Sequence, residues 1–330
     1  MSKKSKRKNN LKESIILLIL LLLLLVSSTY AWFTANQNVT ISTIDVTIEA
    51  SNGIQISTDA LKWKAIITNE DITTNAYSGH KNELPKSIVP VSTIGKIDTN
   101  GYMEMYKGTV TANETTGEYE LKATKAEEST GQFIAFDVFI KADTDTPLQL
   151  TDASYVKAEA DSTDKGIKQA SRVAFVIQGN AATGTNASTL TSLKATADSP
   201  LYIWEPNSNL HTAAAVAHAQ GTYGISTTSD GNAEAITYYG IKNEISTAVK
   251  LKDTAGTDQT NFAKVTPTYV TKTNSDGKIT AAQDIFTVSA GVTKIRMYMW
   301  IEGQDVDCEN TASGTDITFN VQFTVKNKIK

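Results

Sequence analysis

The chain has 330 residues, a formal net charge of −4 and a single cysteine, Cys308. The first 31 residues hold six of the 31 basic and one of the 35 acidic side chains, so the rest has 25 basic and 34 acidic residues and a net charge of −9. Such an acidic chain is a poor electrostatic match for nucleic acid. One cysteine excludes an intrachain disulfide, and the length suits one large all-β domain or two small ones.

The N-terminus combines a basic head, an apolar run and a small-residue exit. Six basic residues lie between Lys3 and Lys12, and residues 15–26 are all apolar. Thr29 and Ala31 lie three and one residues before a cut that would follow Ala31. This order is typical of a signal peptide over residues 1–31, with small side chains where a signal peptidase needs them. The mature chain would then begin at Trp32.

The alternative to cleavage is a membrane anchor. A helix over the apolar run alone would reach only about 18 Å, against a hydrocarbon core of about 30 Å. Counting residues 15–33 gives a segment long enough to span, with Tyr30 and Trp32 at the far interface. In both cases the head stays cytoplasmic and the rest of the chain is exported across the cytoplasmic membrane.

Short strand patterns dominate the exported part. Residues 39–48 alternate apolar and polar side chains, with one slip at Ser42–Thr43 that indicates a β-bulge. Further strands are expected at residues 54–56, 63–67, 101–111, 118–122, 133–140, 172–178, 236–240 and 262–270. Many short strands separated by turns predict an all-β fold, a jelly-roll or Greek-key β-sandwich. We expect residues 32–330 to form a single decorated domain.

Two later strands show the clearest alternation, and their apolar rows should face the core. In the first, the row is Ile295, Met297, Met299 and Ile301, and in the second it is Ile317, Phe319, Val321, Phe323 and Val325.

Helix is expected in one or two connections only. Residues 210–220 are Ala-rich and follow Asn207, Ser208 and Asn209 as candidate caps. Residues 244–252 are a second candidate helix. The small, polar stretches 179–198 and 221–234 are predicted to be loops.

No catalytic arrangement is visible, so we expect the chain not to be an enzyme. His211 and His218 share a face of the predicted helix but have no further ligands nearby in sequence, which favours exposed or partly packed side chains. His80 lacks the second histidine of the zinc-protease pattern. Cys308 has no partner for redox chemistry and is expected to be inert.

The strongest polar cluster is acidic. Asp305, Asp307 and Glu309 alternate along one segment, and Asp316 follows closely. Carboxylates on one side of an extended segment can hold a hard cation such as calcium. The pattern departs from the helix–loop–helix calcium site, because Asn310 stands where a glycine is needed. The alternative is a solvated acidic loop between two strands, and no other cofactor is expected.

The junction Thr-Tyr-Ala-Trp-Phe-Thr at residues 29–34, followed by a Val/Ile-rich strand, resembles the TasA/camelysin-like family of bacterial surface proteins. The resemblance covers residues 1–50. It implies a dedicated signal peptidase, a jelly-roll fold and a place in extracellular biofilm matrix fibres. In such fibres the N-terminal strand of one subunit completes the sheet of the next. The proteolysis attributed to camelysins has no supporting residues here.

The residues supply a physical case for the same assembly. A strand with a bare edge is prone to aggregation, and donating it to another copy satisfies the backbone groups of both chains. Head-to-tail donation does not close, so it produces a filament. Within the candidate donated segment, residues 32–50, the assembly residues are Val39, Ile41, Ile44, Val46 and Ile48.

Two alternatives remain open. The first strand can pair within its own sheet, or the protein can be a monomeric secreted or membrane-anchored binding module. The module would carry a cation or ligand site near residues 305–316.

Overall fold

The computed structural model describes residues 39–48, 54–74, 77, 79, 84–126, 131–158, 166–211, 213–223, 236–254, 256–308 and 316–326. The signal segment, its cleavage residues Thr29, Ala31 and Trp32, and the membrane segment 15–33 lie outside these ranges. None of the helices within them combines the length and apolar character that a membrane crossing requires.

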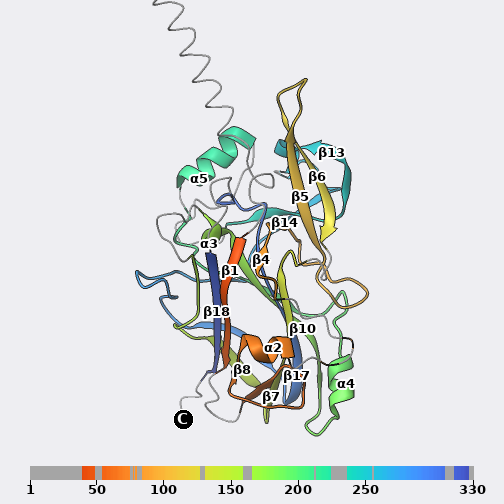
Figure 1. Cartoon of the computed structure of the whole chain (residues 1–330), viewed down its shortest axis with the longest axis vertical. Coiled ribbons are helices and arrows are strands. Elements are labelled where there is room, and N and C mark those ends of the chain that lie inside the picture. The colour runs from red at the N-terminus through yellow and green to blue at the C-terminus, as the bar shows by residue number, and fades with distance from the viewer. Residues whose placement is uncertain are drawn as a thin grey trace, which may run out of the picture.

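Two large sheets form the body of the described chain (Figure 1). The first, sheet A, has the order β16-β8-β18-β1-β3, with β4 paired to β1 and β9 to β18. The second, sheet B, has the order β15-β11-β10-β17-β7-β2. The bounds in sheet A are β1 Val39–Ile48, β3 Ile66–Ile67, β4 Ser87–Ile88, β8 Thr146–Leu150, β9 Tyr155–Ala158, β16 Gln283–Val288 and β18 Asp316–Val325. Those in sheet B are β2 Gln55–Ser57, β7 Ile134–Ala142, β10 Ser171–Ala181, β11 Leu201–Glu205, β15 Tyr269–Val270 and β17 Gly291–Ile301.

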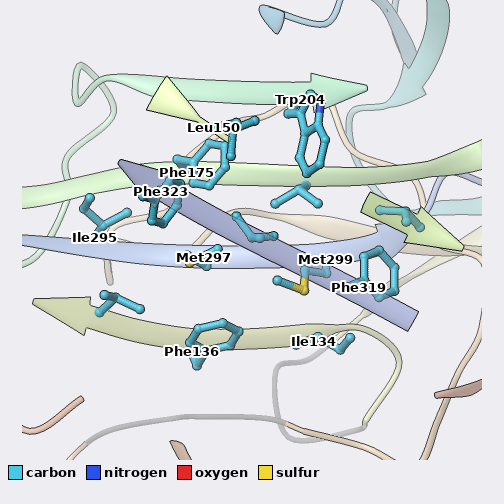
Figure 2. Close-up of a cluster of buried hydrophobic side chains, with 14 of the residues drawn as sticks. Ile134, Phe136, Leu150, Phe175, Trp204, Ile295, Met297, Met299, Phe319 and Phe323 are labelled. Atoms are coloured by element: carbon cyan, nitrogen blue, oxygen red, sulfur yellow. The ribbon is translucent and has the colours of Figure 1, made fainter. Parts of the chain in front are cut away.

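The main hydrophobic core lies between the two sheets, and β18 crosses over the strands of sheet B (Figure 2). The predicted row of β18 is confirmed, because Phe319 and Phe323 are at most 1% exposed. Phe323 packs edge-on against Phe175 of β10, with ring centroids 5.5 Å apart. The intervening Thr318 and Asn320 are also buried, so β18 is covered on both faces rather than on one.

Sheet B is buried on both faces. Met297 and Met299 of β17 face the core between the sheets, while Tyr298 and Trp300 belong to a second core on the other side. The outer face of sheet B is apolar as well, because residues 89–105 and the smaller strands described below cover it. The alternation predicted for β17 is therefore confirmed, as is the central strand expected at residues 133–140, which is β7.

Two smaller sheets decorate the sandwich. A hairpin of β5 (Met105–Ala112) and β6 (Tyr119–Ala126) pairs with β13 (Ile245–Lys250) and projects from one end of the body (Figure 1). Strands β12 (Tyr238–Ile241) and β14 (Phe262–Val265) form the other sheet. The two hairpin strands overlap the strands predicted at residues 101–111 and 118–122.

The helix predicted at residues 244–252 is wrong. Ile245 and Val249 pair with Ala123 and Leu121 on β6, so an available strand edge overrides the local helical pattern. Only a 3₁₀ turn, Leu251–Thr254, follows this strand.

The described helices are short: α2 Asn69–Thr74, α3 Ile167–Ala170, α4 Ala187–Ser192, α5 Ala213–His218 and the π-turn Ala219–Tyr223. Helix α5 confirms the Ala-rich prediction, although it starts later than expected. The amide of Asn207 donates to the carbonyl of Val156, and that of Asn209 to the carbonyl of Thr273. These side chains therefore bind other segments instead of capping α5. Helix α4 lies in a stretch predicted as loop, and Asn186 caps it by accepting from the Thr189 amide at 2.9 Å.

Candidate functional site

The predicted acidic pair lies in a tight turn after β17. The amide of Asp305 donates to the carbonyl of Glu302 at 3.1 Å, and the Asp307 amide donates to Asp305 Oδ1 at 2.9 Å. These bonds fold residues 302–308 back against the ends of β10 and β11. Asp305 is fully buried and Asp307 is 5% exposed, so the alternative of a solvated acidic loop is wrong for these two carboxylates.

His211 lies between this turn and the end of β11. Its Nδ1 hydrogen-bonds Asp307 Oδ2 and lies 3.9 Å from Asp305 Oδ1, and its Nε2 lies 2.7 Å from Glu205 Oε1. His211 precedes α5 and is 5% exposed, so the expectation of an exposed or partly packed side chain is wrong for this residue. His218 is half-buried on α5 itself.

Arg172 supplies the countercharge from β10. Its Nη2 donates to Asp305 Oδ2 at 2.5 Å and lies 3.6 Å from Glu205 Oε1. Its Nη1 donates to the carbonyls of Gln169 and Ser171. The sequence holds one signal for this ion pair: Arg172 begins an apolar strand. Burying a charge there costs folding free energy unless the charge is paired. We name Arg172, Glu205, His211, Asp305 and Asp307 the buried charge cluster.

Gly166, the residue before α3, packs closely against the backbone of this turn. Gly166 has φ +120°, and a Cβ at this position would lie 2.1 Å from the carbonyl oxygen of Asp307. Glycine is needed here both for its backbone conformation and for the close approach. The Gly166 contact therefore helps to hold Asp307 in place.

Burial and charge together shift the titration of this region. Burial disfavours the imidazolium of His211, but the surrounding carboxylates outweigh it and raise its pKa to about 10. Burial, reinforced by Asp305, raises the pKa of Asp307 to about 6. Burial also raises the pKa of the neighbouring Glu302 to about 7. His211 is thus a cation bound between carboxylates at neutral pH.

Three residues of the cluster have the arrangement of metal ligands. One ligand atom from each of His211, Asp305 and Asp307 lies within 4.8 Å of the others. Of the other two predicted ligands, Glu309 lies outside the described residues, and Asp316 is described only through its backbone pairing with Thr40. Two of the four predicted metal residues therefore come together, and they do so around a histidine that the sequence did not assign to them.

A second buried charge network lines a cavity of about 560 Å³ on the outer face of sheet B. Asp137 accepts hydrogen bonds from Arg296 at 2.9 Å and from Tyr77, and lies 3.5 Å from Lys294 Nζ. Burial opposes ionisation of Asp137, but Arg296 and Lys294 outweigh it and lower its pKa. Lys294 also donates to the carbonyl of Thr191 at 2.8 Å. One carboxylate thus holds two buried cations together, so the network is best explained as an internal ion-pair lock.

The candidate assembly strand is β1, which lies inside sheet A. It runs parallel to β18 from Thr40 to Ile48, with a register shift between Ile41 and Thr43 that confirms the predicted bulge. On its other side it pairs with β3 and β4 through two residue pairs each. Only its backbone path is described, so the contacts of its five apolar side chains stay a prediction.

Comparison of the chain with family models, with curated proteins and with solved structures finds no match.

Proposed function

We propose that the protein is an exported structural subunit of a surface or extracellular-matrix filament, assembled by exchange of strand β1 between copies. The support is the position of β1, the first described element, as an interior strand of sheet A between β18 and the β3/β4 pair. Removing it would expose the backbone edge of β18 over most of its length. Such an edge pairs readily with an equivalent strand from another copy.

The export segment and the sandwich agree with this proposal. A cleaved signal over residues 1–31 would free the chain immediately before β1, and the acidic remainder suits an extracellular protein. We further infer a jelly-roll or Greek-key path, because β10 pairs antiparallel with β17 across a long connection. Copies of the same chain are then the principal partners, at the cell surface or outside it.

A cysteine pair across the β1–β18 ladder tests the exchange directly. Thr47 and Gln322 are register partners, and neighbouring strands lie about 4.8 Å apart, within the span of a disulfide. In Thr47→Cys/Gln322→Cys protein, exchanged strands would link different chains. A non-reducing denaturing gel of the assembled protein should then show a ladder of covalent multimers. Cys308 is buried and is left in place.

The matched control is Thr111→Cys/Glu120→Cys. These residues are partners within the β5–β6 hairpin and should give only intrachain disulfides. If the β1–β18 pair also closes only within single chains, and wild-type protein sediments as a monomer under all conditions, strand exchange is refuted.

The second candidate function is the monomeric binding module. The observation that favours it is the burial of Asp305 and Asp307 beside His211. It predicts a monomer in sedimentation and a ligand-dependent rise in melting temperature, whereas the filament proposal predicts multimers.

A further inference from the structure

We propose that His211, Asp305 and Asp307 form a structural site for a divalent transition-metal cation such as zinc or manganese. The inference is independent of strand exchange, since such an ion would stabilise a filament subunit and a monomeric module alike.

The orientation of His211 is that of a metal-ligating histidine. Such histidines usually hydrogen-bond a carboxylate through the second ring nitrogen, which fixes the tautomer and directs the other nitrogen at the metal. Glu205 Oε1, 2.7 Å from Nε2, supplies that contact. His211 carries protons on both ring nitrogens when no metal is bound, so a cation would displace the Nδ1 proton. The proton that stays on Nε2 would then leave the Nδ1 lone pair available to the metal.

The spacing is close to what an ion requires. Ligand atoms of a tetrahedral zinc site with bonds near 2.0–2.2 Å lie about 3.4 Å apart. His211 Nδ1 and Asp305 Oδ1 are 3.9 Å apart, so these two need only a small adjustment. The Asp307 carboxylate now hydrogen-bonds Nδ1 directly, so it would have to turn away until its oxygen lies about 3.4 Å from Nδ1 and the cation fits between them.

Charge provides a further argument. Arg172 offers one positive charge against the carboxylates of Glu205, Asp305 and Asp307, and all four side chains are buried. With His211 protonated, the cluster keeps one uncompensated negative charge, which is costly in a buried position. Exchange of the Nδ1 proton of His211 for one divalent cation neutralises it.

The donor set selects the metal class. One imidazole nitrogen with two carboxylates suits zinc, manganese or cobalt, whereas calcium takes oxygen ligands almost exclusively. Our calcium hypothesis for this region is therefore refined to a cation that accepts nitrogen.

The test is metal titration of the purified full chain after removal of metals with a chelator. We expect isothermal titration calorimetry and elemental analysis to give one equivalent of zinc, with calcium binding at least about 100-fold more weakly. Cobalt serves as a spectroscopic probe, and its visible absorption should report a nitrogen ligand. Glu205→Gln should weaken zinc binding by about 10–100-fold while leaving the ligands in place.

The matched pair of variants is His211→Gln and His218→Gln. Loss of the zinc equivalent in the first and its retention in the second supports the site. Retention of zinc by folded His211→Gln protein, or no zinc, manganese or cobalt bound by wild type, overturns it. If His211→Gln fails to fold, the cobalt spectrum of wild-type and His218→Gln protein decides, because a shell of oxygen ligands alone would refute the proposal.

Discussion

At the residue scale, the ends of three strands bring the buried charges together. Arg172 is opposite Trp300 in the β10–β17 ladder, and Val173 is opposite Trp204 in the β10–β11 ladder. These registers place Glu205 and the turn containing Asp305 next to the guanidinium. Glu205 and Asp305 are both more than thirty positions from Arg172 in the chain, so only the sheet registers could reveal that they lie beside it.

Arg172→Met should destabilise the protein by about 3–5 kcal/mol, because it leaves the carboxylates of Asp305 and Glu205 buried without their permanent countercharge. Urea denaturation followed by circular dichroism measures the change. The control is Lys250→Met, which removes an exposed cation paired to Glu118 and should leave stability at the wild-type value. A loss below about 1 kcal/mol for Arg172→Met would show that the cluster does not depend on this arginine.

Glu302 should make the protein less stable as pH rises from 5 to 8. Its pKa is about 7 in the folded protein, against 4.5 for an ordinary glutamate. The folded state therefore holds a proton that the unfolded chain has released, and this stabilisation, fully present below pH 4.5, is lost as pH rises through 7. The loss amounts to about 3 kcal/mol. His211 acts in the same direction, as its pKa of about 10 gives stability that is fully present below pH 6.5 and is lost as pH rises through 10.

Glu302→Gln should reduce the slope of the stability profile between pH 5 and 8, measured by urea denaturation at each pH, and should leave above pH 6.5 the slope that His211 contributes. Glutamine keeps an oxygen that can accept from the Trp300 indole or the Gln304 amide, but it does not ionise. Glu114→Gln, on an exposed turn, is the control and should retain the wild-type profile. An unchanged slope in Glu302→Gln would place the titrating group elsewhere.

At the element scale, strands that alternate strictly were predictable and the exceptions have tertiary causes. The apolar rows of β17 and β18 follow from their sequences, and so does the bulge in β1. The strand β13 could not be foreseen, because its pairing with β6 depends on an edge that exists only in the folded protein. His211 was predicted within a helix, whereas it lies before α5 because Glu205 and Asp307 fix its ring.

Phe319→Ala in β18 should cost about 3–5 kcal/mol, because it leaves a cavity in the core between the two sheets. Phe319 is completely buried and pairs across the ladder with Ile44. Thr324→Ala, on the other face of the same strand and only partly buried, is the control and should cost far less. Equilibrium urea denaturation compares the two variants. A change below about 1 kcal/mol for Phe319→Ala would mean that the core tolerates the cavity or is packed differently.

At the scale of the whole molecule, the predicted export and the proposed assembly would be two steps that share one boundary. The segment that precedes β1 is the predicted signal, so a cut after Ala31 would leave only residues 32–38 before the strand begins. An uncleaved chain would instead hold β1 close to the membrane surface. In the proposed assembly, the processing site would therefore determine which neighbours a subunit can reach.

Ala31→Leu should block this cut and keep the precursor in the membrane fraction, because a branched side chain does not fit a peptidase pocket that takes small residues. Intact-mass measurement of the exported wild-type protein should give a chain that starts at Trp32. Ala35→Leu, the same substitution four residues beyond the cut, is the control and should be processed normally. If the exported wild-type mass still includes residues 1–31, the segment is an anchor. Strand exchange would then be confined to neighbours on the same membrane.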